Sequence, residues 1–182
     1  MLCLGARATF DTRNMDGFEL ILLLISLFFG AKFLSNWYMA LSGIWPRTRG
    51  RPARGVLGWL PPLSLAIILF TLKVLASFDV VGDFIYLLFY VAIGYAWLSF
   101  GMKLLARFCD LSWLEDAVFR NNRAALWAVA GGFLGLTLIY CGANVGVGPG
   151  WWCVLFAGGL GLIAWLVLAA LIFDVLDGRI AR

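Results

Sequence analysis

The chain alternates between long apolar stretches and short polar connections. The apolar stretches cover residues 18–44, 59–78, 84–108, 124–142 and 151–173. Each is about as long as the ~20 residues that an α-helix needs to cross the hydrocarbon core of a bilayer. The pattern therefore predicts an all-α integral membrane protein, a bundle of about five transmembrane helices.

The composition excludes a soluble globular domain. Hydrophobic residues make up 63% of the 182 residues and charged residues only 13%, and the mean hydropathy is +0.95. An average soluble domain contains about 25% charged residues. A chain of this length has room for one helical bundle but for no further soluble domain of useful size. Any function is therefore expected within the membrane or on the short loops, and lipid is the first partner.

The distribution of basic residues predicts the topology. They gather in the first loop, around the third loop and at the C-terminus, whereas the second and fourth loops contain none. The members of this set are Arg47, Arg49, Arg51, Arg54, Lys103, Arg107, Arg120, Arg123, Arg179 and Arg182. By the positive-inside rule, the first and third loops and the C-terminus are cytoplasmic, and the N-terminus lies outside. The net charge of +4 thus reflects membrane orientation, and no nucleic-acid partner is expected.

Residues 1–17 are predicted as an N-terminal segment before the first helix. Arg7 and Arg13 lie in this segment, on the predicted outer side, where the positive-inside rule disfavours them. A start at Met15 would remove both arginines. Whether Met1 or Met15 is the native start stays open.

The rest of the chain is predicted to form two parts. Residues 18–58 hold the first transmembrane helix and a basic cytoplasmic linker, and residues 59–182 form a four-helix membrane domain. The second helix is expected to begin at Trp59, which would anchor it at the interface. Pro61 and Pro62 would then lie in its first turn, where a missing N–H costs little.

The third loop, residues 107–123, is the most organised polar segment. Read as a helix, it carries apolar residues on one side (Leu111, Leu114, Val118, Phe119) and charged residues on the other (Asp110, Glu115, Asp116, Arg120). This pattern predicts an amphipathic helix along the cytoplasmic interface. Asn121 and Asn122 follow it and offer an N-cap for the fourth helix.

Glycines on the fourth and fifth helices predict close helix packing. Gly131 and Gly135 form a GxxxG spacing, and Gly158 and Gly161 follow on the next helix. Small residues let helix backbones approach in lipid, where hydrophobic burial supplies no drive for association. We expect these glycines to pack the two helices together or to join protomers in a homo-oligomer.

Polar residues inside the apolar stretches are the candidate functional residues. They are Lys32 and Asn36 on the first helix, Lys73 on the second, and Tyr86 and Tyr90 on the third. Intramembrane ionisable residues are costly and often mark a transport path. The alternative is that the lysines reach the interface by snorkelling and that the tyrosines belong to an aromatic belt.

The cysteines give no metal site and no disulfide framework. Cys3 and Cys109 have no evident partner, and the sequence contains no histidine. Cys141 and Cys153 lie at the predicted outer ends of consecutive helices, where a disulfide is geometrically feasible, but two small apolar residues are the simpler interpretation. No cofactor is expected.

The C-terminal residues 174–182, Asp-Val-Leu-Asp-Gly-Arg-Ile-Ala-Arg, resemble the first half of the CDP-alcohol phosphotransferase signature. The resemblance implies that Asp174 and Asp177 bind a divalent metal together with the CDP diphosphate. The second half of that signature does not follow before Arg182, and two carboxylates alone make an open, weak Mg²⁺ site. A truncated phosphotransferase is therefore an alternative, and a chance match on a polar helix end is the more economical interpretation.

The C-terminal half carries a second resemblance. It contains an acidic segment at 114–118, an Asn-Arg-Ala-Ala-Leu entry at 122–126 and a Gly-Gly-containing helix at 131–135. This order is similar to the repeating unit of the YjfL family, small bacterial inner-membrane proteins whose core is a domain of unknown function. The sequence departs from the family in its Arg123 and in the two helices that precede the unit. The resemblance implies a multi-pass protein of the bacterial cell inner membrane.

These observations favour a non-enzymatic packing or assembly subunit, either a homo-oligomer or part of a membrane protein complex. The first alternative is a small transport or permeation component that uses Lys32 and Lys73. The second is the truncated CDP-alcohol phosphotransferase. A dry interior favours the subunit, whereas a polar cavity reached by a lysine favours transport.

Overall fold

The computed structural model describes residues 16–43, 52–76, 84–146 and 150–180, with the backbone alone for residues 52 and 172–180. The helices in chain order are α1 (Gly17–Gly43), α2 (Pro52–Val74), α4 (Phe84–Phe108), the short π-helix η1 (Trp113–Phe119), α5 (Arg123–Ala143) and α6 (Trp151–Ile180). The five α-helices are all long and apolar enough to cross a membrane. The predicted all-α membrane bundle is therefore confirmed.

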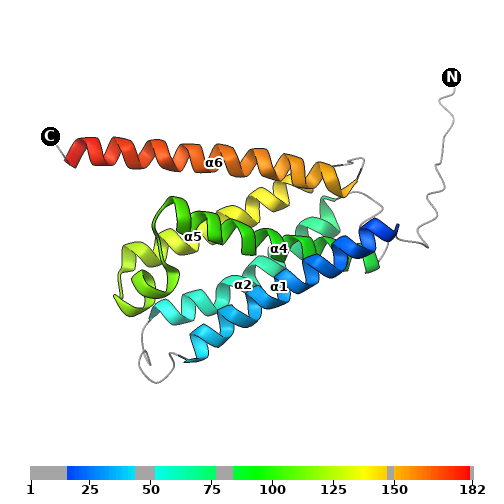
Figure 1. Ribbon diagram of the computed structural model, residues 1–182, viewed down its shortest axis with the longest axis horizontal. Helices are drawn as coiled ribbons and strands as arrows, with labels where there is room; N and C mark the ends of the chain where they lie inside the picture. Colours follow the sequence, from blue (N-terminus) through cyan, green and yellow to red (C-terminus); the bar gives the residue numbers. More distant parts are fainter. Residues whose placement is uncertain (1–15, 44–51, 77–83, 147–149, 181–182) are drawn as a thin grey trace.

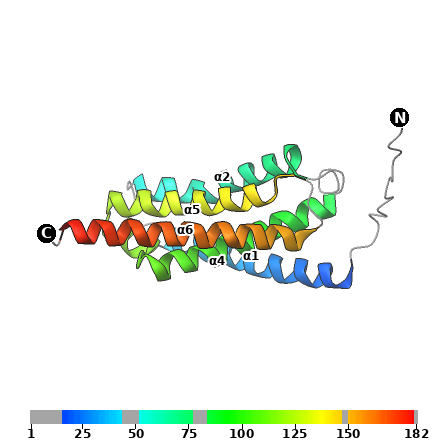
Figure 2. The same cartoon turned by 90° about the horizontal axis from the view of Figure 1, so that it is seen from above.

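Helix α4 lies at the centre of the bundle. It contacts α1, α2, α5 and α6, and α1 packs chiefly along it, while α2 packs chiefly against α5. Helices α1 and α6 are covered least by the rest of the chain. In Figure 1, α6 lies beside α5 near its own first residues and diverges from the other helices toward the C-terminus. Figure 2 shows α6 running along the whole length of the bundle.

The beginning of α2 differs from the sequence prediction. The helix starts at Pro52 and not at Trp59, so that Pro61 and Pro62 lie inside it. A proline inside a helix removes one N–H, and it leaves the carbonyl four residues earlier without its usual donor. In a bilayer such a carbonyl must find another partner.

Helix α1 supplies those partners. The carbonyl oxygens that the two prolines leave free belong to Leu57 and Gly58. The indole Nε1 of Trp37 donates to the Leu57 oxygen over 3.1 Å, and the Tyr38 hydroxyl donates to the Gly58 oxygen over 3.2 Å. Two adjacent side chains of α1 thus replace the two missing backbone bonds, and this is why the prolines are tolerated within the helix.

Similar bonds from aromatic side chains to backbone carbonyls join other helices. The Tyr95 hydroxyl of α4 donates to the Pro61 oxygen of α2 over 2.8 Å. The indole Nε1 of Trp97 donates to the Leu136 oxygen of α5 over 3.3 Å. These bonds satisfy polar side-chain groups inside an apolar bundle and fix how far each helix is shifted along its neighbour.

The third loop also differs from the prediction. In place of one amphipathic helix over 107–123, it contains a seven-residue π-helix that begins at Trp113, and its Ala117 and Val118 are fully buried. Asp110 and Asn121 stand on either side of it with φ of +46° and +52°, the left-handed region that Asp and Asn enter more readily than most residues. Positive φ at both positions ends α4 and separates η1 from α5.

The predicted cap of the fourth helix is confirmed at one of the two asparagines. Asn122 is the N-cap of α5, and its side-chain oxygen accepts from the N–H groups of Ala124 (2.9 Å) and Ala125 (3.3 Å). These bonds satisfy two of the first backbone donors of the helix. Asn121 instead occupies the left-handed turn before the cap.

Candidate functional site

The intramembrane candidates on α1 face away from the bundle. The side chains of Lys32 and Asn36 are exposed, meaning that the rest of the chain does not cover them. The Lys32 Nζ lies 5.7 Å from the centroid of the Phe28 ring, within the range of a cation–π interaction. Both residues therefore face the surroundings of the protein.

The other polar candidates lie on α2 and α4. Lys73 is in the last turn of α2 and exposed. The Tyr86 hydroxyl donates to Glu19 Oε2 over 3.0 Å and so connects α4 to α1. Tyr90 is buried, and its backbone oxygen accepts from the Tyr140 hydroxyl. The structure therefore spreads these candidates over several surfaces and does not assemble them into one polar site.

Three of the predicted packing glycines contact neighbouring helices. A Cβ at Gly161 would lie 3.0 Å from Ile139 Cγ2, and a Cβ at Gly158 would lie 3.4 Å from the Trp97 ring. A Cβ at Gly135 would lie 3.7 Å from the Trp165 ring, an ordinary van der Waals distance. Gly158 and Gly161, both on α6, thus allow this helix to approach α4 and α5 closely.

Gly131 is placed differently. In the part of the chain that the structure describes, a Cβ added there would meet no atom within 4 Å beyond its own turn of helix, and the residue is exposed. Its neighbour Gly132 faces inward, where an added Cβ would overlap the Leu105 side chain of α4. Two consecutive glycines of α5 therefore have different surroundings, one in the core and one on the surface.

Sequence reasoning missed two further close contacts between α4 and α5. A Cβ at Gly101 would lie 2.6 Å from Leu136 Cδ2, and a Cβ at Gly94 would lie 2.9 Å from Tyr140. Gly94 and Gly101 are seven residues apart, about two helical turns, so the sequence does place them on the same face of α4. A search for GxxxG alone does not detect it.

A polar hollow of about 470 Å³ lies between the end of α4 and η1. Three of its four charged groups are engaged with one another: Arg120 lies 3.7 Å from Glu115 and 3.6 Å from Asp116, and Asp116 Oδ2 accepts from the Ser112 N–H over 2.8 Å. The Ser112 hydroxyl in turn accepts from the Glu115 N–H. These contacts cap η1, and ion pairs this exposed contribute only about 0–1 kcal/mol.

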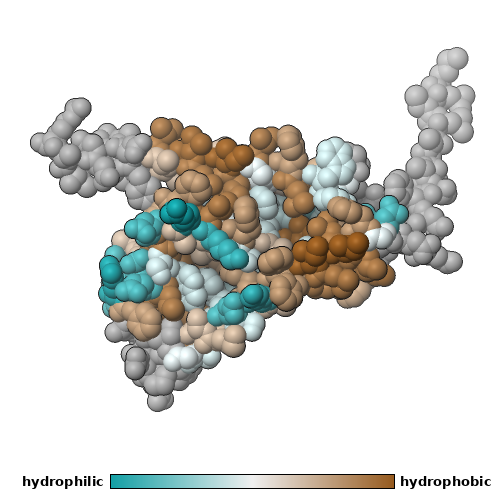
Figure 3. Space-filling view, in the orientation of Figure 1, coloured by the Kyte–Doolittle hydropathy of each residue, from teal (hydrophilic) through white to brown (hydrophobic). Residues whose placement is uncertain are grey.

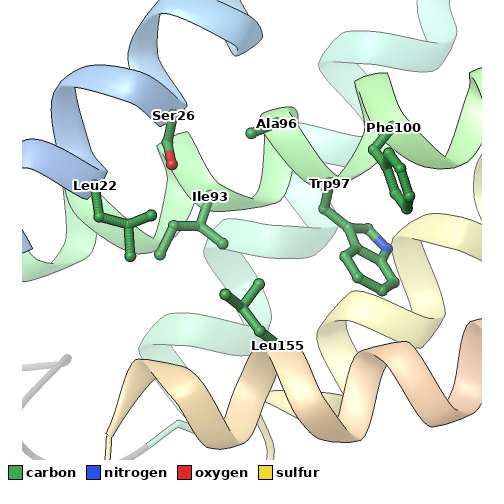
Figure 4. A pocket seen from close by; sticks show the side chains of 7 residues that line it. All are labelled: Leu22, Ser26, Ile93, Ala96, Trp97, Phe100 and Leu155. Atoms are coloured by element: carbon green, nitrogen blue, oxygen red, sulfur yellow. The ribbon is translucent and has the colours of Figure 1, made fainter.

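An apolar groove lies on one side of the bundle, between α6 and the pair formed by α1 and α4. Its volume is about 290 Å³. In Figure 4, Leu22 and Ser26 come from α1, Leu155 comes from α6, and the remaining side chains come from α4. The α4 members are Ile93, Ala96, Trp97 and Phe100.

The cysteines and carboxylates of the described residues form no metal site. No group of three or more Cys, Asp or Glu side chains is close enough to hold an ion among these residues. Cys141 is buried and Cys153 is half-buried, and both are free thiols. The backbone of Asp174 and Asp177 is helical within α6, but their side chains lie outside the described residues.

Comparisons with known proteins give no family. No family model, no curated protein and no solved structure matches this chain. The resemblances to the YjfL family and to the phosphotransferase signature therefore stay predictions. What is established is a multi-pass membrane bundle whose core is apolar and closely packed.

Proposed function

We propose that this protein is a non-enzymatic packing or assembly subunit of a bacterial inner membrane and that it associates with a second copy of itself through α5. The observation that carries the proposal is the outward face of α5. Its exposed small residues are Ala124, Ala128, Gly131 and Gly142. Their intervals of four, three and eleven residues bring them onto one face at 3.6 residues per turn, beside the large exposed side chains of Trp127 and Leu138.

Gly131 is the centre of this face. A glycine inside a helix costs about 1 kcal/mol relative to alanine, and among the described residues nothing within 4 Å uses the space it leaves. Small residues on a lipid-facing surface allow the backbone of another helix to approach closely. A second copy presenting the same face would form a symmetric contact of this kind.

The rest of the bundle supports a structural role over transport. Among the described residues, every buried side-chain nitrogen and oxygen has a hydrogen-bond partner. The two intramembrane lysines are exposed on the outside of α1 and α2. A transport path would need polar groups directed into a shared interior cavity. These arrangements favour the dry, closely packed subunit.

The test is the molecular mass of the full chain in detergent and in lipid nanodiscs. The wild type is expected to be a dimer and Gly131→Leu a monomer, because a leucine would separate the two α5 backbones. Gly159→Leu is the matched control, since Gly159 lies on α6 and also has no atom within 4 Å of an added Cβ. A monomeric wild type, or a Gly131→Leu variant that stays dimeric, would contradict the proposal.

A further inference from the structure

The apolar groove continues into a pair of basic side chains. Ile93, Ala96 and Phe100 line the groove from α4, and Lys103 and Arg107 follow on the same helix. The intervals of three, four, three and four residues place all five positions on one face of α4. Lys103 and Arg107 are both exposed, and among the described residues neither forms an ion pair.

We infer that this surface is a binding site for one anionic phospholipid. The lipid phosphate contacts Lys103 and Arg107, and one acyl chain lies in the groove over Phe100, against Trp97 and Leu155. The site is separate from the α5 face proposed above for self-association, because its lining residues come from α1, α4 and α6.

The dimensions suit a lipid of the leaflet at the basic end of the bundle. Ten residues separate Lys103 from Ile93, about 15 Å along the helix axis. One leaflet contributes about half of the ~30 Å hydrocarbon core. A phosphate held at the end of α4 therefore allows an acyl chain to follow the groove as far as Ile93.

The chemistry also suits this occupant. The groove is apolar apart from Ser26 and the Trp97 indole, and the Trp97 N–H is already bonded to the Leu136 oxygen. An alkyl chain needs no hydrogen bond, so it leaves no polar group without a partner. The two basic side chains have flexible stems and reach toward the headgroup region. In Figure 3, hydrophilic side chains gather over the end of the bundle at the left, while α6 and the first half of α1 show hydrophobic surface.

The experiment is native mass spectrometry of the purified full chain, titrated with phosphatidylglycerol or with phosphatidylcholine of the same acyl chains. The wild type is expected to retain one phosphatidylglycerol in preference to phosphatidylcholine. A basic residue near an anionic headgroup strengthens binding by about fivefold. The double variant Lys103→Gln/Arg107→Gln should therefore weaken phosphatidylglycerol binding about 25-fold and leave phosphatidylcholine unchanged.

Two further variants separate the headgroup contact from the groove. Arg123→Gln removes an exposed basic residue from the same end of the bundle but from α5, and it should keep the preference for phosphatidylglycerol. Leu155→Trp fills the groove and should weaken binding of both lipids. Its melting temperature reports separately whether it is folded.

Several outcomes would overturn the inference. Equal retention of the two lipids by the wild type would show that the headgroup is not recognised. An Arg123→Gln variant that loses the preference as fully as the double variant would show only a general attraction of the basic end. A Leu155→Trp variant that becomes monomeric while binding both lipids normally would assign the groove to a second copy.

Discussion

Trp37 donates its indole N–H to the one carbonyl oxygen of α2 that Pro61 deprives of a backbone donor, the oxygen of Leu57. The bond joins α1 to α2. In lipid, the indole N–H of α1 and the carbonyl oxygen of α2 would each lack a hydrogen-bond partner if its helix stood alone. Trp37 is also stacked on Trp113, with ring centroids 4.2 Å apart. The ring thus connects α1 to α2 and to η1 at once.

Trp37→Phe tests this bond, because it keeps an aromatic ring but removes the N–H. We expect a loss of about 1–3 kcal/mol in the free energy of unfolding, measured by reversible denaturation in mixed micelles, because the hydrogen bond and part of a buried ring are both lost. Trp152→Phe, at a residue of α6 that is 54% exposed, should change it little.

A double-mutant cycle isolates the hydrogen bond from the packing of the ring. Pro61→Ala restores a backbone donor for the Leu57 oxygen, so Trp37→Phe should cost less in that background than in the wild type. Equal costs in both backgrounds would mean that the ring contributes only through its contacts.

The glycine pair on α5 provides a second prediction with an internal control. Gly132→Ala should destabilise the bundle by about 1–3 kcal/mol, because the new methyl group overlaps Leu105. Gly131→Ala has open space within its own chain, so at protein concentrations where the chain is monomeric it should leave the free energy of unfolding unchanged or raise it by up to about 1 kcal/mol. Thermal denaturation of the two variants side by side checks the order, and a Gly132→Ala variant as stable as the wild type would refute the packing.

Cys109 should react slowly with maleimide at neutral pH. Partial burial at the end of α4 raises the pKa of its thiol, and only the thiolate is nucleophilic. Because the raised pKa delays deprotonation, labelling should accelerate at a higher pH than for an ordinary thiol of pKa about 8.5. The comparison is Asp110→Cys, an exposed neighbour, with the other cysteines replaced by serine. Identical pH profiles would show that Cys109 is freely accessible.

The two ends of the bundle should differ in their accessibility from outside the cell. We expect a membrane-impermeant reagent to label Val145→Cys in intact cells but not Asp110→Cys. Asp110 lies between the basic residues Arg107 and Arg120, and the positive-inside rule places such a loop in the cytoplasm. Both positions are exposed, so burial does not bias the comparison. Labelling of Asp110→Cys before the cells are permeabilised would reverse the predicted topology.

We expect no Mg²⁺-dependent CDP-alcohol phosphotransferase activity from the protein in lipid vesicles. Mg²⁺ is held by carboxylates together with substrate phosphates and retained waters, so Asp174 and Asp177 alone should bind it weakly. The assay compares the wild type with Asp177→Ala, with and without Mg²⁺. Metal-dependent turnover that Asp177→Ala abolishes would establish the signature as catalytic.

The five helices and the Asn122 cap could be predicted because both depend on short stretches of sequence. A membrane span is a matter of length and apolar composition, and an N-cap is local. The start of α2 could not be predicted in this way, because the donors that make Pro61 and Pro62 acceptable lie on another helix, some 20 residues earlier in the sequence.

The candidate site was harder to predict for a related reason. Helices in lipid can be apolar on every face, so hydropathy does not reveal which side is inward. This is why the sequence could not show that Gly131 and Gly132 have different surroundings. It also could not show that Lys32 points away from the other helices of the bundle. The groove on α4 depends on how far α6 stands from α1, a distance between helices at opposite ends of the sequence.

The bonds from Trp37 and Tyr38 also bear on the order in which the protein is built into the membrane. With two prolines in its interior, α2 enters the bilayer with two backbone carbonyls that it cannot satisfy by itself. Because α1 precedes α2 in the chain, the donors reach the membrane before the acceptors that require them. We therefore expect α1 to assist the insertion of α2, and exchanging the order of the two segments should expose α2 to lipid with those two carbonyls still free.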